Sequence, residues 1–159
     1  MHARKAAICT GAAMLALAPV AGFTGCSAPT GGSLADWPAF DSLAAIQEAS
    51  GSAVYVSVET VEPDELDGIG QYHVRVLASD PPVDGAEMVI EAPTQNAGNG
   101  VELETGKEYV VFIALHSGEN ASVVSPVEGI FLVVNGRVRS SGEGTFGLGN
   151  LVKSLGLKE

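Results

Sequence analysis

The chain has 159 residues, of which 19 are acidic and 8 basic, and its formal net charge is −11. A surface this acidic repels phosphate groups, which argues against nucleic-acid binding and against membrane attachment through a basic patch. The many acids are interpreted as a solvated surface rather than as a specific cation site.

The first 25 residues have the order of a signal peptide. Arg4 and Lys5 provide a positive start, and residues 6–20 are apolar and uncharged. That segment is about 15 residues long, which suits an export signal and is shorter than the roughly 20 residues that span a bilayer. We therefore expect an exported protein whose first 25 residues are removed.

The apolar segment is followed by Phe23-Thr24-Gly25-Cys26. This run resembles the lipobox of bacterial lipoproteins, although Phe23 departs from the usual aliphatic residue. The resemblance implies cleavage between Gly25 and Cys26 and a diacylglycerol on the Cys26 thiol. It also implies that Cys26 carries fatty acid such as palmitate, and that this lipid anchors the protein on the extracytoplasmic face of the cell membrane. Since Cys9 would be lost with the signal, Cys26 would be unpaired, and lipidation accounts for that. The alternative is a secreted protein with a free thiol.

Residues 26–33 begin with Cys26 and continue with small and polar side chains that cannot bury enough surface to order themselves. They are interpreted as a flexible tether. Residues 34–159 have the length of one ordinary domain, and we expect a single β-rich domain there. Trp37, at its start, is expected to pack against that domain.

Residues 41–50 predict a short helix, with Asp41 as its N-cap and Gly51 at its end. The remaining pattern is mostly that of β-strands. The predicted strands cover residues 53–61, 71–78, 87–92, 108–115, 129–134 and 137–139. The final stretch, 150–157, predicts one or two helical turns.

Three local patterns make these predictions specific. In the second strand Tyr72, Val74 and Val76 alternate with polar residues, so we expect one buried and one solvated face. The strand 108–115 is apolar almost throughout, which predicts burial on both faces. Asn135-Gly136 is the pair favoured in a type I′ hairpin turn.

Short strands, Gly-rich turns and helices near the two ends predict a mainly β fold, either a small antiparallel OB-like barrel or a sandwich with short flanking helices. The order of elements over residues 52–138 resembles small exported bacterial β-barrel domains, which are similar to the OB-type barrel of tissue inhibitors of metalloproteinases. Those inhibitors act through a free amino-terminal cysteine and a disulfide framework. A lipidated Cys26 without a second cysteine argues against that activity.

The densest charged run lies between the first two predicted strands. Its carboxylates are Glu59, Glu62, Asp64, Glu65 and Asp67. Carboxylate oxygens on a loop could hold calcium, which takes 6 to 8 oxygen ligands. The spacing does not match a calcium-binding loop, so a solvated loop is the favoured interpretation.

Other chemistry has little support in the sequence. His73 and His116 have no partner at the spacing of a zinc site, and no nucleophile motif or phosphate-binding loop occurs. We expect no metal and no cofactor. The favoured function is a non-catalytic envelope lipoprotein whose barrel contacts a protein, a glycan or a small ligand. The alternatives are a calcium-binding surface protein and an exported hydrolase-like enzyme that uses carboxylates such as Glu102 and Glu104.

Overall fold

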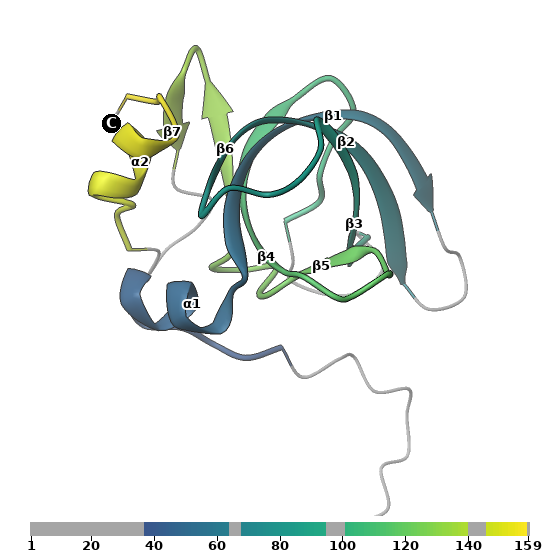
Figure 1. Cartoon of the computed structure of the whole chain (residues 1–159), viewed down its shortest axis with the longest axis horizontal. Helices are drawn as coiled ribbons and strands as arrows, with labels where there is room; N and C mark the ends of the chain where they lie inside the picture. Colours follow the sequence, from purple (N-terminus) through teal and green to yellow (C-terminus); the bar gives the residue numbers. More distant parts are fainter. Residues whose placement is uncertain (1–36, 64–67, 95–100, 140–145, 159) are drawn as a thin grey trace, which may run out of the picture. The chain divides into compact units, whose positions relative to one another are not determined.

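The computed structural model describes residues 37–63, 68–94, 101–139 and 146–158 (Figure 1). The signal peptide, Gly25, Cys26 and the tether lie outside the described residues, so those assignments stay predictions. In the part of the chain that is described, no helix has the length and apolar character needed to cross a membrane.

The described chain is mainly β, as the sequence predicts. The elements are α1 (Leu43–Ala49), β1 (Ser52–Pro63), β2 (Ile69–Asp80), β3 (Glu87–Pro93), β4 (Glu108–Ala114), β5 (Ala121–Val123), β6 (Ile130–Val134), β7 (Arg137–Arg139) and α2 (Asn150–Ser154). Strand β5 was not predicted, because a three-residue strand gives almost no periodic signal.

Five strands close a barrel in the order β1-β2-β3-β5-β4, and β4 pairs back with β1. The barrel differs from the predicted antiparallel arrangement in one pairing, since β3 and β5 pair in parallel through Ile90↔Ala121 and Glu91↔Ser122. The physical reason is the odd number of strands: when direction alternates from strand to strand around a closed ring of five, one neighbouring pair must run in parallel. The result is a small mixed barrel, consistent with the OB-like type.

The predictions of which strand faces are buried are confirmed for β2 and β4. Tyr72 and Val74 are buried and Val76 is half-buried, whereas Arg75 between them is exposed. Every residue from Tyr109 to Ile113 is buried. Strand β4 is covered on both faces because one face points into the barrel and the other points toward the helices.

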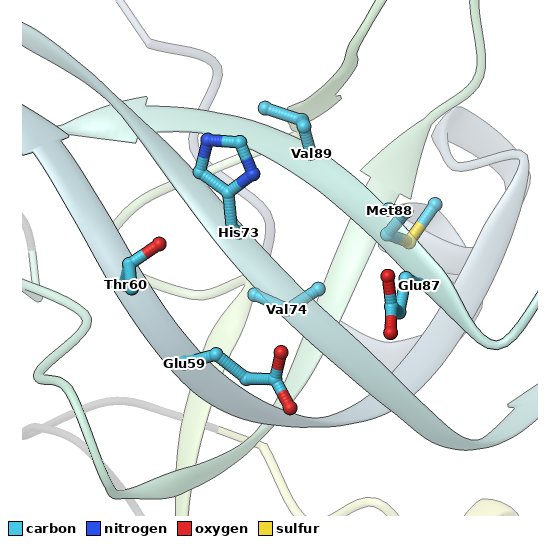
Figure 2. Close-up of a pocket in the computed structure, with 7 residues that line it drawn as sticks. All are labelled: Glu59, Thr60, His73, Val74, Glu87, Met88 and Val89. Carbon is cyan, nitrogen blue, oxygen red and sulfur yellow. The ribbon is translucent and has the colours of Figure 1, made fainter.

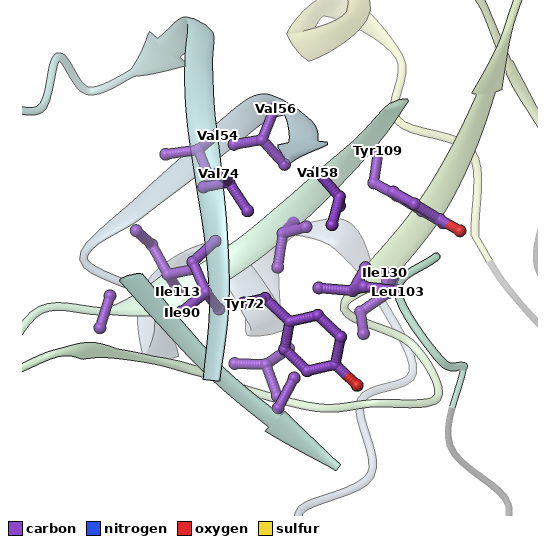
Figure 3. Packing of buried hydrophobic residues seen from close by; sticks show 14 residues of the cluster. Val54, Val56, Val58, Tyr72, Val74, Ile90, Leu103, Tyr109, Ile113 and Ile130 are labelled. Carbon is purple, nitrogen blue, oxygen red and sulfur yellow. The ribbon is translucent and has the colours of Figure 1, made fainter. Parts of the chain in front are cut away.

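The inward side chains form the barrel interior (Figure 3). Val54, Val56 and Val58 of β1 face Tyr109, Val111 and Ile113 of β4 in this cluster. The interior is therefore filled by side chains, which is the usual state of a small barrel.

A second cluster covers the outside of β1, β4 and β6. Ile46 of α1 and Leu151 of α2 pack there with Phe112 and Phe131, whose rings meet edge to face at 6.1 Å between centroids. The two short helices therefore lie on the same side of the barrel (Figure 1). Burial of these apolar side chains holds helices that would be too short to persist alone.

The beginning of the domain differs in one detail from the prediction. Ser42, and not Asp41, is the N-cap of α1, because the Ser42 hydroxyl accepts a hydrogen bond from the Ala45 N–H at 3.3 Å. Trp37 packs half-buried against the barrel interior, as predicted, and Phe40 packs against the outer cluster.

The predicted hairpin turn is confirmed. Asn135 and Gly136 both have positive φ, 54° and 71°, as a type I′ turn between β6 and β7 requires. Near the carboxyl end, Gly156 also has positive φ and follows the C-cap of α2.

Candidate functional site

The first two acids of the predicted acidic loop lie on a strand. Because β1 continues to Pro63, Glu59 and Glu62 both belong to β1 and not to the loop after it. The predicted strand 53–61 already contains Glu59, so the placement that is corrected is that of Glu62. Cross-strand pairing explains the extension, since β2 offers partners as far as Gly70. The Glu59 carboxylate lies 3.3 Å from the Arg75 guanidinium, and the Glu62 carboxylate lies 3.4 Å from the His73 imidazole.

The remaining residues of the calcium hypothesis, Asp64, Glu65 and Asp67, lie outside the described residues. Over the described ranges, no group of three or more His, Cys, Asp or Glu side chains is placed to hold a metal ion. Glu59 and Glu62 are instead directed to basic partners on β2. Calcium binding by this run stays an alternative to the favoured solvated loop.

A groove crosses the outer surface of β1, β2 and β3 (Figure 2). It has a volume of about 360 Å³ and is lined by Glu59, Thr60, His73, Val74, Glu87, Met88 and Val89. His73 lies between Thr60 and Val89, its partners on the neighbouring strands. The groove therefore has a polar wall on β1 and a partly apolar wall on β3.

A second hollow, the β3–β5 depression, lies over β3, β5 and the connection between β4 and β5. It has a volume of about 590 Å³ and is lined by Glu91, His116, Gly118, Glu119, Asn120 and Ser122. Two side-chain contacts define its walls. The Asn120 amide donates to the Glu91 carboxylate at 3.1 Å, and His116 Nε2 lies 2.9 Å from the Ser122 hydroxyl.

The groove and the β3–β5 depression are neighbours on one face. Val89 lines the groove and Glu91 lines the depression, and these residues are two positions apart on β3. Alternate residues of a strand point to the same side at a spacing of about 6.5 Å. The two hollows therefore lie next to each other on the mainly polar outer face of β1, β2, β3 and β5, which we call the candidate binding face.

The contact between His116 and Ser122 has the geometry of a base beside a nucleophile. A working pair of this kind also needs a third group that orients the base. Among the described residues, no side chain contacts the other ring nitrogen of His116, and the ring lies on an exposed loop. The pair is better explained as part of the wall of the depression.

The carboxylates of the enzyme hypothesis lie elsewhere. Glu104 pairs with Lys107 on an exposed loop, and the hydrogen bond to Glu104 raises the pKa of Lys107. The backbone carbonyl of Glu102 lies 3.5 Å from the Tyr109 hydroxyl, which also accepts from the Glu104 N–H. Neither Glu102 nor Glu104 lines the groove or the β3–β5 depression.

Two tyrosines of the barrel wall, Tyr72 and Tyr55, have raised pKa values. Burial, with a smaller contribution from the Glu102 carboxylate, raises the pKa of Tyr72 to about 12. Tyr55, on the other face of the barrel wall, has its pKa raised to about 12 by burial and by its hydrogen bond to Glu108. Both hydroxyls thus stay neutral and structural at ordinary pH.

The β3–β5 depression was not anticipated from the sequence. Alternation places Glu91 on the outer face of its strand, but nothing local indicates that Asn120 and Ser122 lie beside it. The contact between Asn120 and Glu91 joins residues 29 positions apart. Only the parallel pairing of β3 with the unpredicted β5 brings them together.

Comparison of the chain with protein families, with curated proteins and with solved structures finds no match.

Proposed function

We propose that this chain is an exported lipoprotein, attached by lipid on Cys26 to the extracytoplasmic face of the cell membrane, whose barrel is a non-catalytic binding module. Its candidate binding face contacts a protein or a glycan of the cell envelope. The observation that carries the proposal is the pair of neighbouring hollows over β1, β2, β3 and β5.

The position of these hollows supports a binding role. OB-type barrels bind their ligands on the face of strands 2 and 3 and on the loops between strands 1 and 2 and between strands 4 and 5. In this barrel the groove lies on β2 and β3, and the β4–β5 connection supplies His116 and Asn120 to the depression. Fold alone does not determine function, so the support comes from the side chains that line the hollows.

The lipid anchor is supported by the sequence alone. A positive start, a short apolar segment and a lipobox-like run occur in the order of a lipoprotein precursor. Two acyl chains give stable attachment where one is marginal, since each buried CH₂ contributes about 0.8 kcal/mol. Lipid is also the attachment that an acidic chain needs, because its charge does not favour an anionic membrane surface.

The anchor is tested by Cys26→Ser in the full chain, expressed in its native envelope. The variant should leave the membrane fraction and should no longer incorporate labelled fatty acid. Ala28→Ser, two residues away, is the control and should behave as the wild type. Membrane retention and labelling that are unchanged in Cys26→Ser would disprove lipidation.

The candidate binding face is tested by affinity capture of cross-linked envelope components with the full chain as bait. Val89→Arg places a long charged side chain between the two hollows, and we expect it to abolish the specifically captured component. Val134→Arg is the control, since Val134 is an exposed valine on β6 that lines neither hollow. Equal capture by wild type, Val89→Arg and Val134→Arg would show that this face is not the interaction surface.

A further inference from the structure

We propose that the β3–β5 depression binds a neutral, hydroxyl-rich ligand, namely a segment of uncharged glycan. The inference rests on the proposed role of the barrel as a binding module, and it specifies the ligand class of one part of the candidate binding face.

The walls of the depression are fixed before a ligand arrives. Glu91 and Ser122 are partners in the parallel pairing of β3 and β5, so their side chains stand side by side on the outer face. Asn120 holds Glu91 and His116 holds Ser122, each through a hydrogen-bond contact. Groups that are already positioned lose little conformational freedom on binding, which favours affinity.

These four side chains keep unused hydrogen-bonding capacity toward the hollow. The contact with Asn120 occupies one carboxylate oxygen of Glu91, and its second oxygen is a further acceptor. The Asn120 amide has a carbonyl oxygen and a second N–H, and the Ser122 hydroxyl and the His116 ring each have another hydrogen-bonding position. A sugar hydroxyl both donates and accepts, so neighbouring hydroxyls match this mixture of acceptors and donors.

The lining residues disfavour two other ligand classes, anions and apolar molecules. Glu91 and Glu119 are acidic and no Lys or Arg lines the depression, so phosphate, sulfate and carboxylate ligands would be repelled. No aliphatic side chain lines it, and its one aromatic ring is the polar imidazole of His116, so an apolar ligand would gain little apolar contact with the lining side chains. The volume of about 590 Å³ lies within the range of small-ligand sites.

The test uses the purified full chain in detergent on an array of immobilised oligosaccharides. The neutral probes are short oligomers of glucose, mannose, galactose and N-acetylglucosamine. Uronic acid oligomers provide the anionic arm, and glucosamine oligomers with free amino groups provide the cationic arm. We expect saturable binding to at least one neutral probe, no binding to the anionic probes, and a dissociation constant by calorimetry for the neutral probe that binds best.

Two variants are measured separately against that probe. Glu91→Gln removes the charge of the central acceptor, and Asn120→Ala removes the amide; each should raise the dissociation constant about tenfold. Glu48→Gln, an exposed acid on α1, should leave the dissociation constant unchanged. Thermal unfolding of every variant checks that the fold is retained.

The inference is overturned if no neutral probe binds, if only the cationic probes bind, or if neither variant weakens binding while both remain folded. Its failure is distinct from failure of the proposed function. If Val89→Arg still abolishes envelope capture, the binding module stands and only the glycan assignment falls.

Discussion

Glu91 on β3 stands beside Ser122 on β5, across the one parallel strand pairing among the described strands. This pairing both closes the barrel and builds the β3–β5 depression, because it brings the β4–β5 connection against the outer face of β3. Closure of the fold and formation of the candidate site therefore depend on the same few backbone contacts.

A tight approach of backbone to backbone explains why position 129 is glycine. A Cβ on Gly129 would collide with the carbonyl oxygen of Ser125 and would lie 3.1 Å from the Ser125 nitrogen, in the turn that leads into β6. Overpacking of this kind costs about 1–3 kcal/mol, so we expect Gly129→Ala to lower the free energy of unfolding by that amount in urea denaturation. Gly147→Ala is the matched control, since a Cβ there meets nothing within 4 Å, and it should change stability by less than about 0.5 kcal/mol.

Alkaline pH should destabilise the barrel through Tyr72. The pKa of Tyr72 is about 12 in the folded chain and 10.0 in the reference state, so between these values the unfolded chain loses a proton that the folded chain keeps. This group therefore leaves the free energy of unfolding nearly unchanged below pH 10 and lowers it as the pH rises toward 12, by at most about 3 kcal/mol. Urea midpoints measured from pH 8 to pH 11.5 should decline less steeply in Tyr72→Phe.

At pH 8 that variant should be within about 1 kcal/mol of wild type, because the lost hydrogen bond to the Pro93 carbonyl is long, at 3.4 Å. Part of the alkaline decline should remain in Tyr72→Phe, because Tyr55 has a similarly raised pKa. Parallel curves for wild type and Tyr72→Phe would contradict the role assigned to Tyr72.

The outer cluster should be as important to stability as the barrel interior. Phe131 is 1% exposed and contacts the rings of both Phe112 and Phe146. Replacement of a buried phenylalanine by alanine costs about 3–5 kcal/mol, and we expect Phe131→Ala to lose that much in chemical denaturation. Val134→Ala, three residues along the same strand but 38% exposed, should lose under about 1 kcal/mol, and equal losses would contradict the burial pattern of β6.

Calcium should not stabilise the domain. Glu59 and Glu62 lie close to Arg75 and His73, and the acidic run lacks the spacing of a calcium loop. At about 1 mM Ca²⁺, which equals the weakest dissociation constants of extracellular calcium modules, the urea midpoint should equal that in chelator. A ligand that binds only the folded state stabilises it by RT ln(1 + [L]/Kd), so a midpoint that rises with Ca²⁺ and returns with Asp64→Asn would establish the cation site instead.

The sequence predicts most of the local structure because alternation within a strand is a local property. The inward residues Tyr72 and Val74, the fully buried β4 and the turn at Asn135-Gly136 all follow from patterns a few residues long. Strand order is different, since it depends on contacts between distant segments. The short β5 gives no pattern of its own, and without it neither the parallel pairing nor the neighbourhood of Glu91 and Asn120 can be inferred.

The same limit applies to the acidic run. Its charge suggests a loop, but β1 continues through Glu62 because β2 supplies pairing partners and because the side chains of Arg75 and His73 on β2 lie within 3.4 Å of the two acids. Cross-strand partners, which only the folded chain reveals, outweighed the low strand preference of glutamate.

The outer cluster also sets the order in which the domain can be completed. Ile46 of α1 packs in a cluster with Leu151, Leu155 and Leu157, which the chain reaches about 100 residues later. Phe112 and Phe131 lack part of their apolar cover until that segment has been made. A ribosome-bound chain that does not yet include Leu157 therefore cannot complete this side of the barrel, and the last packing step waits for α2.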